Sequence, residues 1–304
     1  MIILFNGCSH TEGSGIPRVA TWSNMVCKSL VRNSTFFHVG FTKGQTLSKY
    51  FKYIVDVIKD EKNLGISIAR SGKGNDSICL DTLEAIENLK DINKKPDYVF
   101  IQWSGVARRL IQKRSGTLEY TNPWDSPEFG LPIEPHASEI SIYYMKLLES
   151  YLKLNNIEYI FLPYMEFDTE ENYKTLSSYK NLDFSKIILH KNGFGKFMDY
   201  FKKNNLTIDE QGHPTTLGHW FLAAEFLNKL DSNQNLIGYF DFFKCTAGNT
   251  DIIQISNEIE LETKKNDHIF DEWSEKETNK NFKKRGLFKS YKETEKYIIK
   301  KIFG

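Results

Sequence analysis

Short apolar runs alternate with longer amphipathic segments over the first three quarters of this chain. Four of the runs have the length of strands buried on both faces of a sheet. They occupy residues 1–5, 64–69, 98–103 and 157–162. Segments with helical spacing of apolar residues lie between and after them, at 22–31, 47–58, 78–89, 140–154, 197–201 and 219–230. This alternation is typical of βαβ units, so the pattern predicts an α/β fold with a central parallel sheet and helices on both faces.

In such a sheet, ligands bind in the loops that follow the carboxyl ends of the strands. We therefore expect the loops Asn6–Gly15, Ser71–Asn75 and Ser104–Arg109 to face one site. The stretch from Arg108 to His136 is rich in Pro, Gly and Ser, and it is expected to be a long excursion that includes a small hairpin.

Charge divides the chain into two parts. The 304 residues carry a net charge of +1, but this total is a cancellation. Residues 250–275 hold eight acidic and two basic side chains, and residues 276–304 hold ten Lys or Arg and three Glu. We expect an α/β domain over residues 1–232 and a C-terminal extension over 233–304, acidic and then basic, with helical segments.

Composition excludes several classes of protein. The hydrophobic and charged fractions, 40% and 26%, are those of a globular chain. No apolar run approaches the roughly 20 residues that cross a bilayer, and no signal peptide is visible. The four cysteines have no paired spacing, which favours reduced thiols in a cytosolic setting or in a particle assembled there.

Charge also bears on partners. The neutral body argues against nucleic-acid binding, and we expect no metal or cofactor. The basic residues 276–304 suit either docking on a partner protein or an anionic surface, or packing on their own domain, and a homo-oligomer is left open.

Two segments carry residues suited to acyl chemistry. Ser9 follows the first predicted strand within Gly7-Cys8-Ser9-His10-Thr11-Glu12-Gly13, where a turn into a helix exposes a serine hydroxyl. His213 follows Asp209 and Glu210 in a tight loop, where either acid can orient an imidazole. The alternative readings are a helix-capping serine and a surface histidine.

These segments resemble the conserved blocks of the SGNH (GDSL) hydrolase superfamily. The segment around Ser9 is similar to its first block, G-D-S-x-T-x-G, in the G-C-S-x-T form of a subgroup frequent in bacteriophages. Residues 67–72 are similar to the second block, and residues 210–214 to the last block, D-x-x-H-P. The resemblance covers residues 1–232 and implies a three-layer α/β/α, flavodoxin-like fold.

The resemblance also implies an esterase or deacetylase acting on ester-linked acyl groups, including those of acylated carbohydrates. Ser9 is then the nucleophile, His213 the base and Glu210 its orienting acid, with Asp209 as a rival. The backbone N–H groups of Ser9 and Gly72 line the oxyanion hole. The third block departs from the family because Val106 occupies the position of an oxyanion-stabilising Asn.

Further residues complete the candidate site. Side chains that could replace the missing Asn as a donor are those of Asn75, Gln102 and Arg108. The substrate-binding candidates are His10, Trp103 and Arg108, although core packing also explains the tryptophan. Gly72-Lys73-Gly74-Asn75 has a weak likeness to a phosphate loop, and an oxyanion turn or a helix-entry turn is the favoured interpretation. The departure at Val106 keeps open a second hypothesis, a structural or attachment protein of the virion type.

Overall fold

The computed structural model describes most of the α/β part of the chain. It covers residues 1–16, 21–31, 34–39, 58–106, 108–112, 118–121, 136–163, 182–188, 207–208 and 212–230, with residues 47, 51, 54 and 201. The predicted extension over residues 233–304 therefore lies outside the described residues. So do the candidate acids Asp209 and Glu210.

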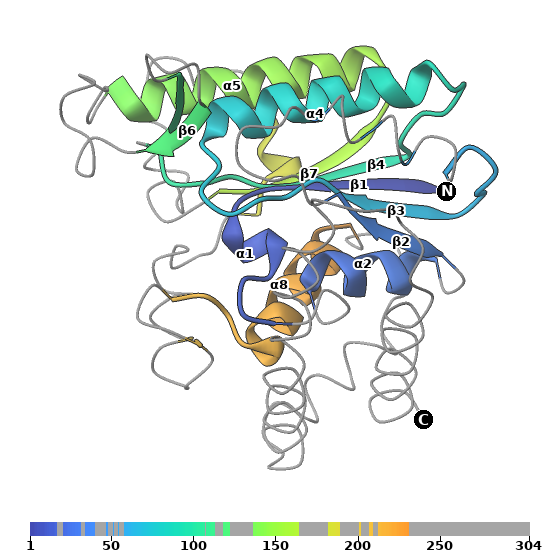
Figure 1. Cartoon of the computed structure of the whole chain (residues 1–304), viewed down its shortest axis with the longest axis horizontal. Helices are drawn as coiled ribbons and strands as arrows, with labels where there is room; N and C mark the ends of the chain where they lie inside the picture. Colours follow the sequence, from blue (N-terminus) through green and yellow to red (C-terminus); the bar gives the residue numbers. More distant parts are fainter. Residues whose placement is uncertain are drawn as a thin grey trace, which may run out of the picture.

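A five-stranded, fully parallel sheet forms the centre of the molecule (Figure 1). Its order is β2-β3-β1-β4-β7. The strands are β1 (Ile2–Asn6), β2 (Thr35–His38), β3 (Leu64–Ser67), β4 (Tyr98–Gln102) and β7 (Glu158–Leu162). Because the chain lays down β2 and β3 on one side of β1 and then β4 and β7 on the other, the winding reverses at β1. A reversal of this kind opens a crevice for ligands at the carboxyl ends of the strands.

Helices cover both faces of the sheet, so the predicted three-layer α/β/α architecture is confirmed (Figure 1). On one face lie α4 (Asn75–Lys90) and α5 (His136–Leu154). On the other face lie α1 (Ser9–Glu12), α2 (Trp22–Leu30) and α8 (Thr216–Leu230). A 3₁₀ turn, η4, spans Phe184–Lys186.

Strand β1 shows why an apolar run becomes a central strand. Ile2 and Leu4 join the hydrophobic cluster under α4 and α5, whereas Ile3 and Phe5 join the cluster under α2 and α8. Successive side chains of a strand point to opposite faces, so a strand covered on both faces must be apolar at every position. In the second cluster, Trp22 stacks on Phe226 with ring centroids 4.1 Å apart.

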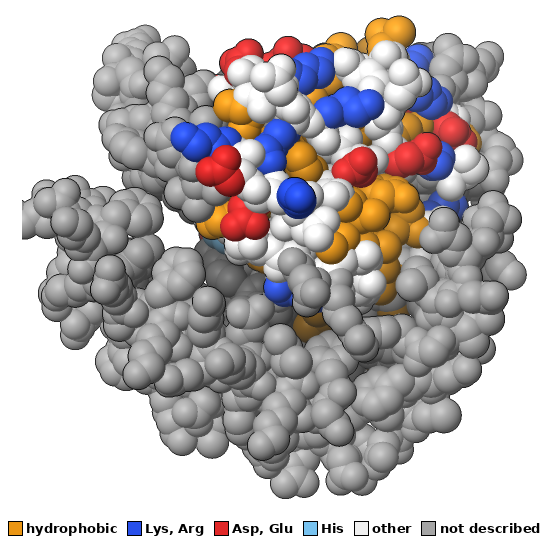
Figure 2. All heavy atoms as spheres, turned by 90° about the vertical axis from the view of Figure 1, so that its right-hand side faces the viewer, with side chains coloured by type: hydrophobic (Ala, Val, Ile, Leu, Met, Phe, Trp, Pro, Cys, Tyr) orange, Lys and Arg blue, Asp and Glu red, His pale blue; other side chains and the backbone are white. Residues whose placement is uncertain are grey.

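The long excursion contains the small hairpin that its composition predicts. Strands β5 (Arg109–Gln112) and β6 (Leu118–Thr121) pair antiparallel outside the central sheet. Among the described residues, no helix is long and apolar enough to cross a membrane. Figure 2 shows Lys and Arg side chains mixed with Asp and Glu over the described part of one face, where no field of a single sign develops.

Candidate active site

The three loops expected at the carboxyl edge of the sheet do meet there. Between the first and second loops, the Ser71 N–H donates to Glu12 Oε2 at 2.5 Å. The N–H of Arg70, directly before the second loop, donates to the Gly7 carbonyl at 3.1 Å. Between the second and third, Asn75 Nδ2 donates to the Ser104 carbonyl at 3.1 Å. These contacts confirm that the three loops lie together at this edge, and their use as one site stays a prediction.

Ser9 lies at the point where the sheet reverses its winding. It is the first residue of α1, which follows directly from β1, and only 5% of it is exposed. The turn before it requires glycine, because a Cβ on Gly7 would lie 2.2 Å from Thr11 Oγ1. Gly13 ends the helix with φ +79°, a conformation that glycine adopts without strain. Local sequence thus fixes a tight strand-turn-helix element around the candidate nucleophile.

The loop with His213 reaches the same place from the other end of the domain. Its backbone is held by the Ile208 N–H, which donates to the His213 carbonyl at 2.8 Å, and by a bridge between Thr207 and Pro214. The His213 ring then packs edge to face against the ring of His10, with centroids 5.1 Å apart. His10 is adjacent to Ser9 in the chain, so two segments that are distant in sequence bring Ser9 and His213 into one neighbourhood.

A third histidine, His219, lies near this pair. His219 on α8 is fully buried, and its Nδ1 accepts the Trp22 N–H at 3.1 Å. The neutral ring therefore carries its proton on Nε2. Burial, together with the smaller effect of the nearby His10 and His213 imidazoles, lowers the pKa of His219 to about 3. His219 is thus a neutral ring that joins α8 to α2, and in the described part of the chain no cluster of His, Cys, Asp or Glu is arranged to hold a metal ion.

Among the oxyanion candidates, Gly72 has the backbone freedom that its turn requires, with φ +80°. Asn75 is engaged in full: its Nδ2 donates to the Ser104 carbonyl and to Ser141 Oγ, and its Oδ1 accepts the Ser104 N–H at 2.7 Å. These contacts tie α4 to the loop after β4. The role of Asn75 as an oxyanion donor stays a prediction, as do those of Ser9 and Gly72.

The two other donor candidates differ in their contacts. Arg108 Nη1 donates to Ser104 Oγ at 3.4 Å. Gln102 is buried at the end of β4, where its Oε1 accepts the Thr11 hydroxyl at 2.7 Å. No described residue pairs with Gln102 Nε2, so this side chain keeps an unused donor next to α1.

Core packing accounts for two residues that follow β4. Trp103 is 1% exposed and meets Phe161 edge to face with centroids 5.3 Å apart. Val106 is 2% exposed and belongs to the same hydrophobic cluster. The assignments of Trp103, His10 and Arg108 to substrate binding stay predictions.

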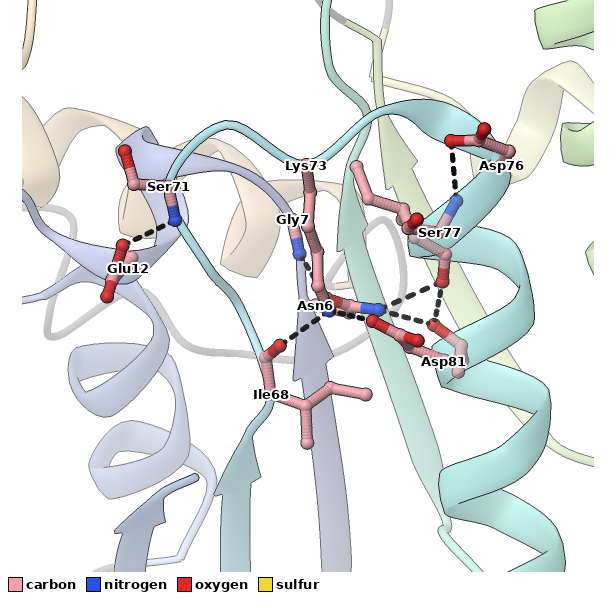
Figure 3. A network of polar contacts seen from close by, with 11 residues as sticks. Asn6, Gly7, Glu12, Ile68, Ser71, Lys73, Asp76, Ser77 and Asp81 are labelled. Carbon is pink, nitrogen blue, oxygen red and sulfur yellow. Dashed lines mark hydrogen bonds and ion pairs between the residues drawn. The ribbon is translucent and has the colours of Figure 1, made fainter. Parts of the chain in front are cut away.

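The glycine-rich loop after β3 leads directly into a helix, since α4 begins at Asn75. The Lys73 side chain is completely buried there. Figure 3 shows the polar groups around it. The sequence does not reveal this burial, because lysine is nearly always exposed. The signal in the sequence that could have indicated this burial is a lysine between two glycines directly before a predicted helix.

No family model matches this chain, and neither does any curated protein. Solved structures with a similar course of the chain include TesA, with 10% identity and a TM-score of 0.41 over 76% of this chain and 98% of that one. The esterase EstA from Pseudoalteromonas sp., inhibited by monoethylphosphonate, has 12% identity and a TM-score of 0.39 over 75% and 96%. The lipase Lip_vut3 from a goat rumen metagenome has 13% identity and a TM-score of 0.38 over 75% and 97%. TM-scores this low carry no conclusion about family or activity.

Proposed function

We propose that this chain is a serine hydrolase that cleaves ester-linked acyl groups, including those of acylated carbohydrates. The observation that carries the proposal is the contact between His213 and His10 beside Ser9, at the strand where the sheet reverses its winding. A serine hydroxyl is a weak nucleophile until a base accepts its proton, and the contact of His213 with the neighbour of Ser9 supports His213 as that base.

The proposed reaction has two steps. Ser9 Oγ attacks the acyl carbon while its proton passes to a ring nitrogen of His213, and the C–O bond to the leaving alcohol breaks as that alcohol takes up the proton. Water then attacks the acyl-enzyme and releases the acid together with free Ser9. The N–H groups of Ser9 and Gly72 stabilise the charge that develops on the carbonyl oxygen. Gln102 Nε2 is a candidate for a third hydrogen-bond donor to this oxygen, because it has no hydrogen-bond partner among the described residues.

Covalent labelling tests the nucleophile directly. A fluorophosphonate should lose fluoride and form a P–O bond to Ser9, and a tryptic digest should place the added mass on the peptide that contains this residue. Labelling should be lost in Ser9→Ala and strongly slowed in His213→Ala. Ser29→Ala is the matched control, because the Ser29 hydroxyl donates to the Met25 carbonyl within α2, and it should label at the wild-type rate. Equal labelling of Ser9→Ala would refute the proposal.

A second candidate function rests on Val106. Its side chain is in the core and cannot donate a hydrogen bond. The family that this chain resembles has an Asn donor at this position. Loss of one such donor costs about 10²–10³ in rate, which favours a structural or attachment protein that keeps the fold without turnover. A wild-type chain that neither labels nor hydrolyses an ester panel, yet assembles into a defined particle, would establish this second function.

A further inference from the structure

Lys73 directly follows the proposed oxyanion glycine, and its ammonium group is enclosed by protein oxygens. Nζ lies 3.0 Å from Asn6 Oδ1, 2.8 Å from the Ile68 carbonyl and 2.5 Å from Asp81 Oδ2 (Figure 3). The side chain has no exposed surface. Two of these contacts are hydrogen bonds, to Asn6 and Ile68, and the third is an ion pair with the Asp81 carboxylate. The ammonium group is therefore engaged with the protein itself.

The partners of this ammonium belong to different parts of the fold. Asn6 ends β1, Ile68 follows β3, and Asp81 lies on α4. One side chain therefore connects the two strands that precede the Ser9 turn and the Gly72 turn, and anchors both to a helix.

Asn6 links the Lys73 ammonium to the Ser9 turn by hydrogen bonds. Its Oδ1 accepts the Gly7 N–H at 2.8 Å as well as the Lys73 ammonium. Its Nδ2 donates to the Ile78 carbonyl and to Thr82 Oγ1, both at 2.9 Å. The amide is thus bonded on both sides, and the first peptide of the turn toward Ser9 depends on its orientation. Without the ammonium, Asn6 Oδ1 loses the charged donor that holds it.

The charges match this role. Burial lowers the pKa of Lys73, and the neighbouring Asp81 carboxylate opposes that change. A buried charge is retained in proteins where a partner and further hydrogen bonds compensate for lost hydration, and all of these are present. On the solvent side, Glu12 provides a separate tether, because its carboxylate accepts the Ser71 N–H (Figure 3).

We propose that Lys73 is a positioning residue that fixes the Ser9 turn against the Gly72 turn and so sets the separation of the two backbone N–H groups of the oxyanion hole. This inference rests on the proposed function. Its catalytic consequence follows from geometry, since a misplacement of about 1 Å can cost about 10²-fold in rate. Because these N–H groups act on charge that exists only in the transition state, their displacement lowers kcat and leaves KM unchanged.

The test compares Lys73→Met with a matched control, Tyr159→Phe. The control removes a hydroxyl that donates to the buried Glu149 at 2.6 Å on the edge strand β7, away from the site. We expect Lys73→Met to lower kcat for a nitrophenyl ester about 10- to 100-fold, with KM within about twofold. Tyr159→Phe should keep the wild-type kcat. Equal kcat in Lys73→Met and wild type, or an equal loss in the control, would overturn the proposal.

Hydrogen exchange measured by mass spectrometry separates this inference from the proposed function. Lys73→Met should accelerate exchange in peptides covering residues 6–13 and 68–75, and Tyr159→Phe should not. If the wild type hydrolyses no ester, the proposed function fails. The positioning role of Lys73 is then tested by exchange alone, and unchanged exchange in these peptides of Lys73→Met would refute it. If Lys73→Met does not fold, Asp81→Asn provides the test. This variant should lower kcat and accelerate hydrogen exchange in the same peptides, each by a smaller factor than Lys73→Met. An unchanged kcat and unchanged exchange would contradict the proposal.

Discussion

The buried ring of His219 predicts a loss of stability in mild acid. The perturbation is a drop in pH from 7 to 5, with His219→Asn as the comparison protein. A protonated His219 has to release the Trp22 N–H from Nδ1 and carry a charge in a fully buried position next to His10 and His213. An asparagine Oδ1 can accept the same N–H and does not titrate in this range.

The size of the effect follows from the pKa of His219. Folding lowers it from 6.5 to about 3, so between these values the unfolded chain binds more protons than the folded one. The free energy of unfolding therefore has its full value above about pH 6.5 and decreases as the pH falls toward 3. For one group with this shift, the loss between pH 7 and pH 5 is about 2 kcal/mol.

Urea unfolding followed by tryptophan fluorescence measures this difference. Other groups titrate in both proteins, so the informative quantity is the change with pH in the wild type minus the change in His219→Asn. We expect the wild type to lose about 2 kcal/mol more than the variant between pH 7 and pH 5. Equal losses in the two proteins would show that His219 does not remain neutral in the folded state.

Three further substitutions near the site, and one control at an exposed position, test the packing by urea unfolding. Gly7→Ala should destabilise the fold by about 1–3 kcal/mol, because its Cβ would lie 2.2 Å from Thr11 Oγ1, and a neutral outcome would show that the turn can relax. Trp22→Ala should cost about 3–5 kcal/mol, because the ring is fully buried, whereas Leu154→Ala at an 83% exposed position should cost less than about 0.5 kcal/mol. Glu12→Gln should cost about 1 kcal/mol by replacing a charged acceptor with a neutral one, and an unchanged midpoint would exclude that contribution.

Much of the fold follows from the periodicity of the sequence, with one strand missed. The central strands are predictable because burial on both faces demands continuous apolar runs, as in β1. Strand β2, residues Thr35–His38, was not predicted: it is a short edge strand of intermediate burial, so its sequence lacks such a run. The shared edge of the three loops is predictable because parallel strands all end on the same side.

The chemistry of the site is less accessible from the sequence. Lys73 gains its role from oxygens of Asn6, Ile68 and Asp81, which meet only when two strands and a helix have docked. The neutral state of His219 likewise depends on α8 packing against α2. Local patterns identify residues that are capable of chemistry, but burial and partners from distant segments decide what those residues do.

Hydrolysis of a series of p-nitrophenyl esters by wild type, Ser9→Ala and Ser29→Ala tests the central claim most directly. We expect wild type and Ser29→Ala to release nitrophenol at equal rates and Ser9→Ala to lose at least about 10³-fold in kcat. A Ser9→Ala protein that hydrolyses these esters at the full rate would contradict the assignment of Ser9 as the nucleophile.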